Sequence, residues 1–265
     1  MAEEKENQVV GLVKASSNVL CQFYQDLAQP SVKAMGQALA TVFELCPNSL
    51  LSLKLWTEKR KLNFAKRLNE YKEKLEQIPE EKRVEVDTQI GTPIVEKLTY
   101  TTNDEIADLF TTLLANASNI DTVNRAHPAF IDIISRLSED EARIIEHLSG
   151  KDEVLYCSFR GIVPLPEEGF ITIQNYATLL PYQVNLNFPE NISAYISNLV
   201  SIGIMQNMEG FYKSNEDEYN EICKKYKLEE LKNQYIPKIY REIEVAKGFY
   251  EITPFGKLFI NACVK

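Results

Sequence analysis

The sequence contains few of the residues on which enzymes and metal sites usually depend. Of its 265 residues, two are histidine, one is tryptophan and five are cysteine. The cysteines are widely separated and form no C-x-x-C pair, so neither a zinc site nor a disulfide framework is indicated. The chain also lacks G-x-G-x-x-G, G-x-x-x-x-G-K-[ST] and H-E-x-x-H motifs. We therefore expect no cofactor, no metal ion, no catalytic residue and no enzymatic activity.

The histidines and the densest acidic group are expected to serve the fold. His127 precedes Pro128 at an expected helix start, and His147 is expected on the solvated face of a later helix. Glu139-Asp140-Glu141 is expected in the first turn of that later helix, where the helix dipole favours carboxylates. A nuclease or hydrolase stays an alternative, because acidic and histidine side chains far apart in sequence can converge in one cleft.

Positive charge is absent from Gly161 to Tyr212, where no Lys, Arg or His occurs. An expected helix opens there at Pro189, in the position of the recognition helix of a winged helix-turn-helix. A helix that reads DNA needs cations for phosphates and donors for base edges. With a net charge of −9, the chain is not expected to bind nucleic acid or to be drawn as a whole to anionic lipid. The alternative is a winged-helix DNA-binding transcriptional regulator with cations from residues 54–74, Lys224, Lys225 or Lys227.

Residues 54–74 form the one distinctly basic segment and contain the single tryptophan. The plainer interpretation is the solvated face of a long bundle helix. The sharper interpretation is a surface that meets a membrane, an acidic partner or nucleic acid. The residues of this candidate interaction surface are Lys54, Trp56, Lys59, Arg60, Lys61, Lys66 and Arg67.

Residues 31–53 carry a wide apolar stripe with few charges. Such a stripe predicts either burial in the core of a bundle or an interface with a membrane or another chain. No uncharged apolar run reaches the roughly 18–20 residues that span a bilayer. The N-terminus also lacks the basic-then-apolar order of a signal peptide, so a cytoplasmic protein is expected.

Helical spacing dominates the first half of the chain, and the last block mixes helices with strands. We expect a mainly α fold, with a helical bundle over residues 1–136 and a winged-helix-like α+β module over residues 137–265. Short strands are expected at 170–173, 202–208 and 249–253, and a final helix is expected after the cap Thr253-Pro254. One or two helices within 214–247 are expected as an insertion between the wing strands.

Three segments, taken in order, resemble the bacterial abortive infection alpha (Abi-alpha) family. Residues 104–117 are similar to its acidic helix that closes in L-L-A-N-A, and residues 127–145 are similar to its h-P-x-F…L-x-x-L-S-x-x-D-A-x-I run, in which h is an apolar residue. This chain departs from that run by carrying Glu141 directly before the alanine, with Asp140 one residue earlier. Residues 199–204 with 250–256 resemble its ending, L-x-x-x-G-I…Y-x-I-T-P-F-G in this chain. The resemblance covers about residues 85–265 and rests on the ordered set of segments.

This resemblance implies a role in bacterial defence against phage, in which the infected cell is arrested or killed. It implies no defined active site, so no catalytic residue is carried over. The expected partner is a protein, for example one of phage origin, or a membrane surface, and a homo-oligomer is an open alternative. Peripheral association with the inner membrane is the corresponding alternative to a purely cytoplasmic location.

Overall fold

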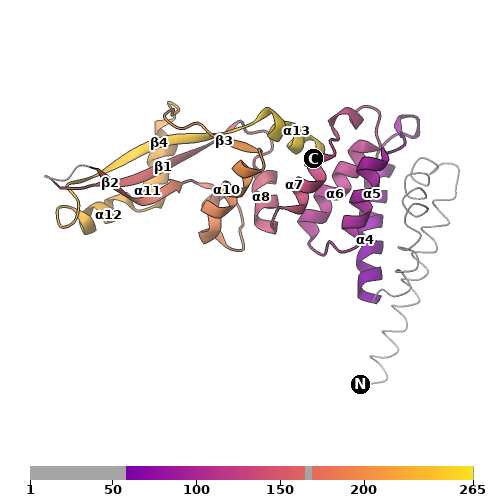
Figure 1. The fold of residues 1–265 in the computed structure, drawn as a ribbon, viewed down its shortest axis with the longest axis horizontal. Coiled ribbons are helices and arrows are strands. Elements are labelled where there is room, and N and C mark those ends of the chain that lie inside the picture. The colour runs from indigo at the N-terminus through magenta and orange to yellow at the C-terminus, as the bar shows by residue number, and fades with distance from the viewer. Residues whose placement is uncertain (1–57, 165–168, 265) are drawn as a thin grey trace, which may run out of the picture. The chain divides into compact units, whose positions relative to one another are not determined.

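The computed structural model of the protein describes residues 58–164 and 169–264 (Figure 1). The chain divides into two compact units, Met1–Ala142 with Phe259–Lys265, and Arg143–Leu258. The boundaries fall inside helices α8 (Glu139–His147) and α13 (Pro254–Cys263). The domain boundary that we place at 136/137 from the sequence stays a prediction. Residues 31–53, Lys54 and Trp56 lie outside the described residues.

The first unit is built from helices, as predicted for this part of the chain. Its described elements are α4 (Glu58–Glu76), η2 (Glu80–Lys82), α5 (Thr88–Leu98), α6 (Asp104–Ala117), η3 (Val123–Arg125) and α7 (Ala129–Ser135). Helix α6 is its centre, because it contacts α4, α5 and α7. Apolar residues three or four apart in its sequence predict one buried stripe along this helix. The stripe is confirmed, with Ile106 half-buried and the rest buried: Leu109, Phe110, Leu113, Leu114 and Ala117.

The sequence pattern S/T-x-x-E, which predicts a capping box at a helix start, occurs at Thr102–Glu105 and at Ser138–Glu141, and the two have different outcomes. Ser138 and Glu141 form the predicted box at the start of α8: the Ser138 N–H donates to Glu141 Oε2 (2.7 Å), and the Glu141 N–H donates to Ser138 Oγ (3.3 Å). The box predicted at Thr102 is wrong by one residue. Asn103 caps α6, with its Oδ1 accepting from the Ile106 N–H at 2.9 Å. Asn is as good an N-cap as Thr, so local preference could not choose between the neighbours.

The second unit contains a four-stranded antiparallel sheet with strand order β2-β1-β4-β3. Its central strands are β1 (Glu153–Ile162) and β4 (Glu242–Ile252), which pair from Glu153↔Glu251 to Ile162↔Glu242. β2 (Phe170–Ala177) forms one edge, and the short β3 (Met205–Asn207) forms the other. The predicted strand at 170–173 is therefore confirmed but extends further.

Strand β1 was not anticipated from the sequence, because residues 154–159 are all buried. A strand covered on both faces lacks the alternation of apolar and polar residues that marks a half-buried strand. The helix predicted around Ile239, Tyr240 and Ile243 is wrong, since β4 begins at Glu242. The alternation Glu242-Ile243-Glu244-Val245, with the isoleucine buried and both glutamates exposed, was the overlooked strand signal.

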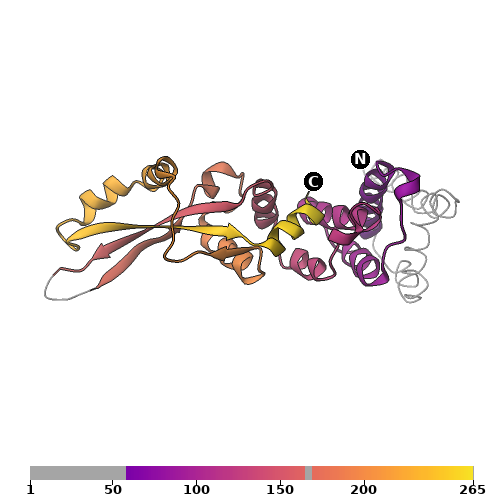
Figure 2. The same cartoon turned by 90° about the horizontal axis from the view of Figure 1, so that it is seen from above.

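Helices α11 (Glu216–Lys225) and α12 (Leu228–Tyr235) lie between β3 and β4 in the chain, as predicted for the insertion. Figure 2 shows both helices on one side of the sheet. Tyr219 and Ile222 of α11 are fully buried against strand residues of that face, and the Tyr219 hydroxyl donates to the Gly248 carbonyl at 3.1 Å. Strand residues of the same core are Leu155, Cys157, Phe159, Ile243 and Phe249.

The other face of the sheet carries three mutually packed tyrosines. The ring centroids of Tyr156 and Tyr176, and of Tyr156 and Tyr250, lie 5.0 Å apart. Tyr156 also lies over Gly248, its cross-strand partner, where a Cβ would fall 2.3 Å from the ring. Gly248 thus leaves room for the tyrosine cluster on one face of the sheet. Its carbonyl accepts the hydrogen bond from Tyr219 of α11, which packs on the opposite face.

The elements expected for a winged helix occur in the predicted order: α10 (Ile192–Ser201), β3, β4 and α13. Thr253 caps α13 as predicted, since its Oγ1 accepts from the Gly256 N–H at 2.8 Å. The sheet, however, continues from β4 into β1 and β2, and the second unit is a mixed α+β structure. The winged-helix assignment stays a prediction. Among the helices that the structure describes, none combines the length and apolar character needed to cross a membrane.

Alanine at Gly256 is expected to destabilise the protein, although alanine normally stabilises a helix interior by about 0.5–1 kcal/mol relative to glycine. A Cβ at position 256 would lie 2.1 Å from the backbone oxygen of Ile204, just before β3. We expect Gly256→Ala to lower the free energy of unfolding by about 1–3 kcal/mol. Urea denaturation measures the change, with exposed Asn261→Ala in α13 as the control. Equal stability of Gly256→Ala and the wild type would contradict this close approach.

Candidate functional site

The structure describes part of the candidate interaction surface on α4. Lys59 and Arg60 are exposed in the first turn, and Arg60 Nε donates to the Thr99 carbonyl at 3.2 Å. The backbone of Lys61 continues the helix, but its side chain is outside the description, as are Lys54 and Trp56. Only Lys59, Arg60 and Lys66 of the seven residues are therefore placed at the surface by the described side chains.

Arg67 lies inside the fold and not on the exposed surface where we placed it. Its side chain is 1% exposed. Its guanidinium donates to Glu70 Oε1 at 2.9 Å, to Asp104 Oδ1 at 2.6 Å and to the Thr102 carbonyl at 3.0 Å. Arginine is seldom buried unless paired, and here the carboxylates of α4 and α6 provide the pairing. Arg67 therefore fixes the start of α6 against α4.

Two other cations of α4, Lys66 and Lys74, are also paired with carboxylates of α6. Lys66 Nζ lies 2.8 Å from Asp104 Oδ1, and Lys74 Nζ lies 2.6 Å from Asp108 Oδ1. Hydrogen bonds from Lys66 and then Arg67 lower the pKa of Asp104 below its usual value. The basic face of α4 is thus substantially neutralised within the first unit, which favours the plainer interpretation of this segment.

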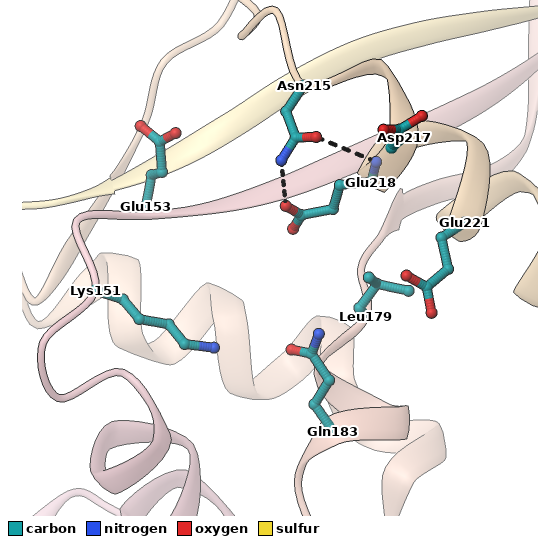
Figure 3. Close-up of a pocket in the computed structure, with 8 residues that line it drawn as sticks. All are labelled: Lys151, Glu153, Leu179, Gln183, Asn215, Asp217, Glu218 and Glu221. Carbon is teal, nitrogen blue, oxygen red and sulfur yellow. Dashed lines mark hydrogen bonds between the residues drawn. The ribbon is translucent and has the colours of Figure 1, made fainter.

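An acidic cleft in the second unit gathers side chains that are far apart in the sequence (Figure 3). The cleft has a volume of about 440 Å³. Lys151 and Glu153 come from the start of β1, Leu179 and Gln183 from the region of α9 (Leu180–Gln183), and the rest from α11. Figure 3 shows Lys151, Gln183 and Glu218 extending toward the middle of the cleft. The lining residues of α11 are its N-cap Asn215 and Asp217, Glu218 and Glu221.

The start of α11 places the carboxylates of the cleft. Asn215 caps the helix, and its Oδ1 accepts from the Glu218 N–H at 3.4 Å while its Nδ2 donates to Glu218 Oε2 at 2.9 Å. This reciprocal arrangement resembles a capping box and fixes the Glu218 side chain at the helix start. Glu221 follows one turn later, where residues three apart share a helix face. Two carboxylates of α11 therefore face the same region.

The carboxylates of the cleft are crowded. Burial is the largest cause that raises the pKa of Glu218, the neighbouring Lys151 opposes it, and Glu153 and Glu221 raise it further. Burial lowers the pKa of Lys151, and Glu218 counteracts that shift. Four carboxylates, from Glu153, Asp217, Glu218 and Glu221, thus line the cleft together with one ammonium group, that of Lys151. Glu153 also pairs with Lys213, which is not part of the lining, with Nζ 2.5 Å from Oε2. An additional cation in the cleft would relieve the repulsion that raises the pKa of Glu218.

His147 adjoins the cleft without lining it. Its Nε2 lies 2.5 Å from Lys151 Nζ and 3.2 Å from Gln183 Oε1. Burial, followed by the charge of Lys151, lowers the pKa of His147, which favours the neutral ring. His147 is half-buried, so the solvated face on which we placed it is only partly exposed at this residue. His127 does mark its predicted helix start, where Nδ1 accepts from the Ala129 N–H at 3.1 Å.

Within residues 58–164 and 169–264, no group of three or more His, Cys, Asp or Glu side chains has the arrangement of a metal site. The cleft can therefore be described by charge and hydrogen bonding: it offers carboxylate acceptors and one lysine donor. Sequence reasoning did not single out any of these residues. The available signal was Asn215 followed by Glu216-Asp217-Glu218, a capping residue with an acidic first turn. That signal locates a helix start but not the cleft beside it.

The chain combines a helical unit with an α+β unit that holds this acidic cleft, and comparison with protein families agrees with the sequence resemblance. The family model described as "Abortive infection alpha" matches residues 57–263. The chain therefore belongs to the abortive infection alpha family. Membership indicates a defence role of the abortive-infection type.

No curated protein matches the chain. Among solved structures, the chain is similar to an uncharacterized protein from the hydrocarbon-degrading marine bacterium Alcanivorax borkumensis SK2. The identity is 14%, the similarity covers 52% of this chain and 93% of the other, and the TM-score is 0.33. A likeness at this level carries no argument about fold or function.

Replacing Arg67 is expected to test whether this residue is structural. Arg67→Ala removes a buried guanidinium and its hydrogen bonds to Glu70, Thr102 and Asp104. We therefore expect a loss of about 2–4 kcal/mol in the free energy of unfolding. Lys66→Ala is the matched control, because Lys66 contacts the same Asp104 but is 52% exposed and should change stability by about 0–1 kcal/mol.

The contribution of Arg67 to the free energy of unfolding should also decrease as the pH becomes acidic. The pKa of Asp104 is lowered in the folded protein, so its pairing stabilises the fold above the ordinary carboxyl pKa. This stability is lost as pH falls through the lowered pKa. Urea denaturation at neutral and acidic pH should therefore show a smaller difference between wild type and Arg67→Ala in acid. Equal effects of Arg67→Ala and Lys66→Ala at neutral pH would contradict a structural role.

Proposed function

We propose that this protein is a non-enzymatic component of an abortive-infection-type defence response, and that its second unit binds a cationic segment of a protein partner. The observation that carries the proposal is the gathering of four carboxylates along one cleft. Burial, and then the neighbouring Glu153 and Glu221, raise the pKa of Glu218 there. Lysine or arginine side chains are the groups that such a site attracts, and arginine also pairs with carboxylates in a bidentate way.

The size of the cleft supports a side chain or short segment as the occupant. About 440 Å³ falls in the range of pockets that hold small ligands, about 300–1,000 Å³. The lining glutamates of α11 accompany Asn215 and Gln183, whose amides can add directed hydrogen bonds. A basic side chain of a partner would enter this cleft while the rest of the partner contacts its rim. Binding there is the step that we assign to recognition of a phage product.

A protein partner is favoured over an anionic membrane or DNA on electrostatic grounds. The chain has a net charge of −9, and α10 presents exposed Ser193, Ser197 and Ser201 with no cation in residues 161–212. Phosphate backbones require lysine or arginine contacts, and anionic lipid surfaces attract clusters of the same residues. The DNA-binding alternative would show as a mobility shift with strong salt dependence, which we do not expect from this unit.

A hydrolase is the second candidate function, and one observation favours it. Glu218 has a raised pKa beside the cleft, and His147 contacts the lining residues Lys151 and Gln183. Perturbed acidic groups near a histidine are typical of acid–base sites as well as of binding sites. Mass spectrometry of a peptide incubated with the protein separates the two candidates, because a binding site returns the peptide intact and a hydrolase returns fragments.

Neutralising the cleft is expected to weaken peptide binding. A lysine-rich peptide should bind the full chain, and Glu218→Gln with Glu221→Gln should reduce affinity by about tenfold or more, which corresponds to about 1.4 kcal/mol. Exposed Glu190→Gln is the control for loss of one negative charge away from the cleft. Titration calorimetry measures the affinities, and spermidine in a parallel titration distinguishes a free polyamine from a peptide-borne cation. Unchanged affinity of the double variant would remove the cleft as the binding site.

Peptide binding should also weaken as the solution becomes acidic. The pKa of Glu218 is raised, so this carboxylate takes up a proton at a higher pH than an ordinary glutamate and the cleft then loses negative charge. Glu218→Gln should bind more weakly and lose part of this pH dependence.

In cells, the double variant Glu218→Gln with Glu221→Gln should fail to protect a culture against phage, whereas Glu190→Gln should protect as the wild type does. Full protection by the double variant would contradict the proposal.

A further inference from the structure

Within the part of the chain that the structure describes, strand β2 is an edge strand of the sheet. It pairs with β1 on one side, and the sheet order places no strand of the described residues on its other side. From Phe170 to Ala177 the strand contains no charged residue and no proline. Natural edge strands are usually protected by lysine, proline or a covering element, and an unprotected edge is a template for pairing with another strand.

The register shows which backbone groups face outward. The Val163 N–H donates to the Gly169 carbonyl at 3.1 Å, which makes 163 and 169 a hydrogen-bonded pair. Hydrogen-bonded and non-hydrogen-bonded pairs alternate along an antiparallel ladder. Gly161↔Ile171 is therefore the next hydrogen-bonded pair, and Ile162↔Phe170 and Arg160↔Thr172 are non-hydrogen-bonded. The N–H and C=O groups of Phe170 and Thr172 consequently point away from β1.

The same part of β2 exposes apolar side chains on both faces of the sheet. Phe170 is 52% exposed, with the Arg160 guanidinium 4.6 Å from its ring centroid, and Ile171 is 56% exposed. Across from Ile171 stands Gly161, over which the Tyr240 ring lies. Further along, the register shifts opposite Phe159, and Tyr176 has a φ of 49°. The regular, open part of the edge is thus Phe170–Gln174.

We propose that this edge pairs with β2 of a second copy of the chain, antiparallel and about a two-fold axis beside Ile171. In this register Ile171 faces Ile171 of the second copy, and Phe170 faces Thr172 of the second copy. The outward groups of residues 170 and 172 then exchange hydrogen bonds, as an antiparallel ladder requires. The pairing joins the two sheets into one continuous sheet and covers both exposed apolar residues.

Electrostatics favours a second copy over a charged foreign strand. β2 carries no charge that could select a partner of opposite sign. Two copies that each carry a net charge of −9 repel, and the repulsion is least where the approaching strands are neutral. An isologous contact also needs only one self-complementary patch, which the 170–172 register provides. The short edge strand β3, Met205–Asn207, offers less length for such pairing.

The inference deepens the proposed function, on which its biological meaning rests, by naming one partner of the same unit. A two-fold dimer would carry two acidic clefts, so a partner with two basic segments would be held by both. Dimerisation is measured on the purified protein without phage or peptide. A monomeric protein would therefore contradict this inference but leave the proposed peptide binding in the cleft intact. Conversely, Glu218→Gln with Glu221→Gln should associate as the wild type does.

Introducing a charge of either sign at Ile171, the residue beside the proposed two-fold axis, gives the decisive test. Sedimentation equilibrium of the full chain should show concentration-dependent dimers for the wild type. Ile171→Lys alone and Ile171→Glu alone should each be monomeric, because like charges then face each other across the axis. An equimolar mixture of the two variants should form heterodimers. The matched controls Ile120→Lys and Ile120→Glu change a 57%-exposed isoleucine of the first unit and should dimerise normally.

A second variant separates loss of pairing from loss of folding. Thr172→Pro removes an outward N–H without removing a hydrogen bond of the β1–β2 ladder, and proline is tolerated on edge strands in this orientation. It should be monomeric with unchanged far-ultraviolet circular dichroism. A wild type that is monomeric over the whole concentration range would overturn the proposal. Dimers that persist in both Ile171 single variants, or a mixture that stays monomeric, would overturn it equally.

Discussion

The second unit depends on the pairing of β1 with β4 along their whole lengths. The ladder runs from Glu153↔Glu251 to Ile162↔Glu242 and joins segments separated by α10, α11 and α12. Because β1 is covered on both faces, its side chains organise two layers at once: Phe159 packs toward the inserted helices, and Tyr156 packs into the tyrosine cluster. The cleft follows from this pairing, since the start of β1 supplies Glu153 beneath the start of α11.

Charge in the described parts of the protein is arranged so that many cations meet carboxylates within their own unit. Lys66, Arg67 and Lys74 pair with α6 carboxylates in the first unit. In the second unit, Lys247 pairs with Glu216 at 2.6 Å and Lys213 with Glu153 at 2.5 Å. The chain has an excess of acidic residues, and the cleft concentrates part of that excess where one lining lysine is shared among several glutamates. Local crowding, more than net charge, therefore distinguishes the cleft from the rest of the surface.

Features that depend on residues close together in the sequence were predicted correctly, and features that depend on distant residues were not. The apolar stripe of α6, the Ser138–Glu141 box and the Thr253 cap depend on neighbours within a few residues, and each was predictable. β1 was missed because burial on both faces removes its alternation, and Arg67 was misplaced because its partners Thr102 and Asp104 lie more than thirty residues away. The cleft was missed for the same reason, since Lys151 and Glu218 meet only after the sheet has formed. Family membership was predictable from ordered segments without knowledge of any site.

Helices α11 and α12 lie in the chain between strands β3 and β4. The pairing of these strands does not depend on which side chains the two helices expose to solvent. Only their inward residues, such as Tyr219 and Ile222, are held by the core. Their outward residues, Asp217 and Glu221 among them, are free to change without altering the strand register. The β1–β4 ladder therefore preserves the architecture of the unit, while the solvent-facing side of the inserted helices can change in sequence independently of it.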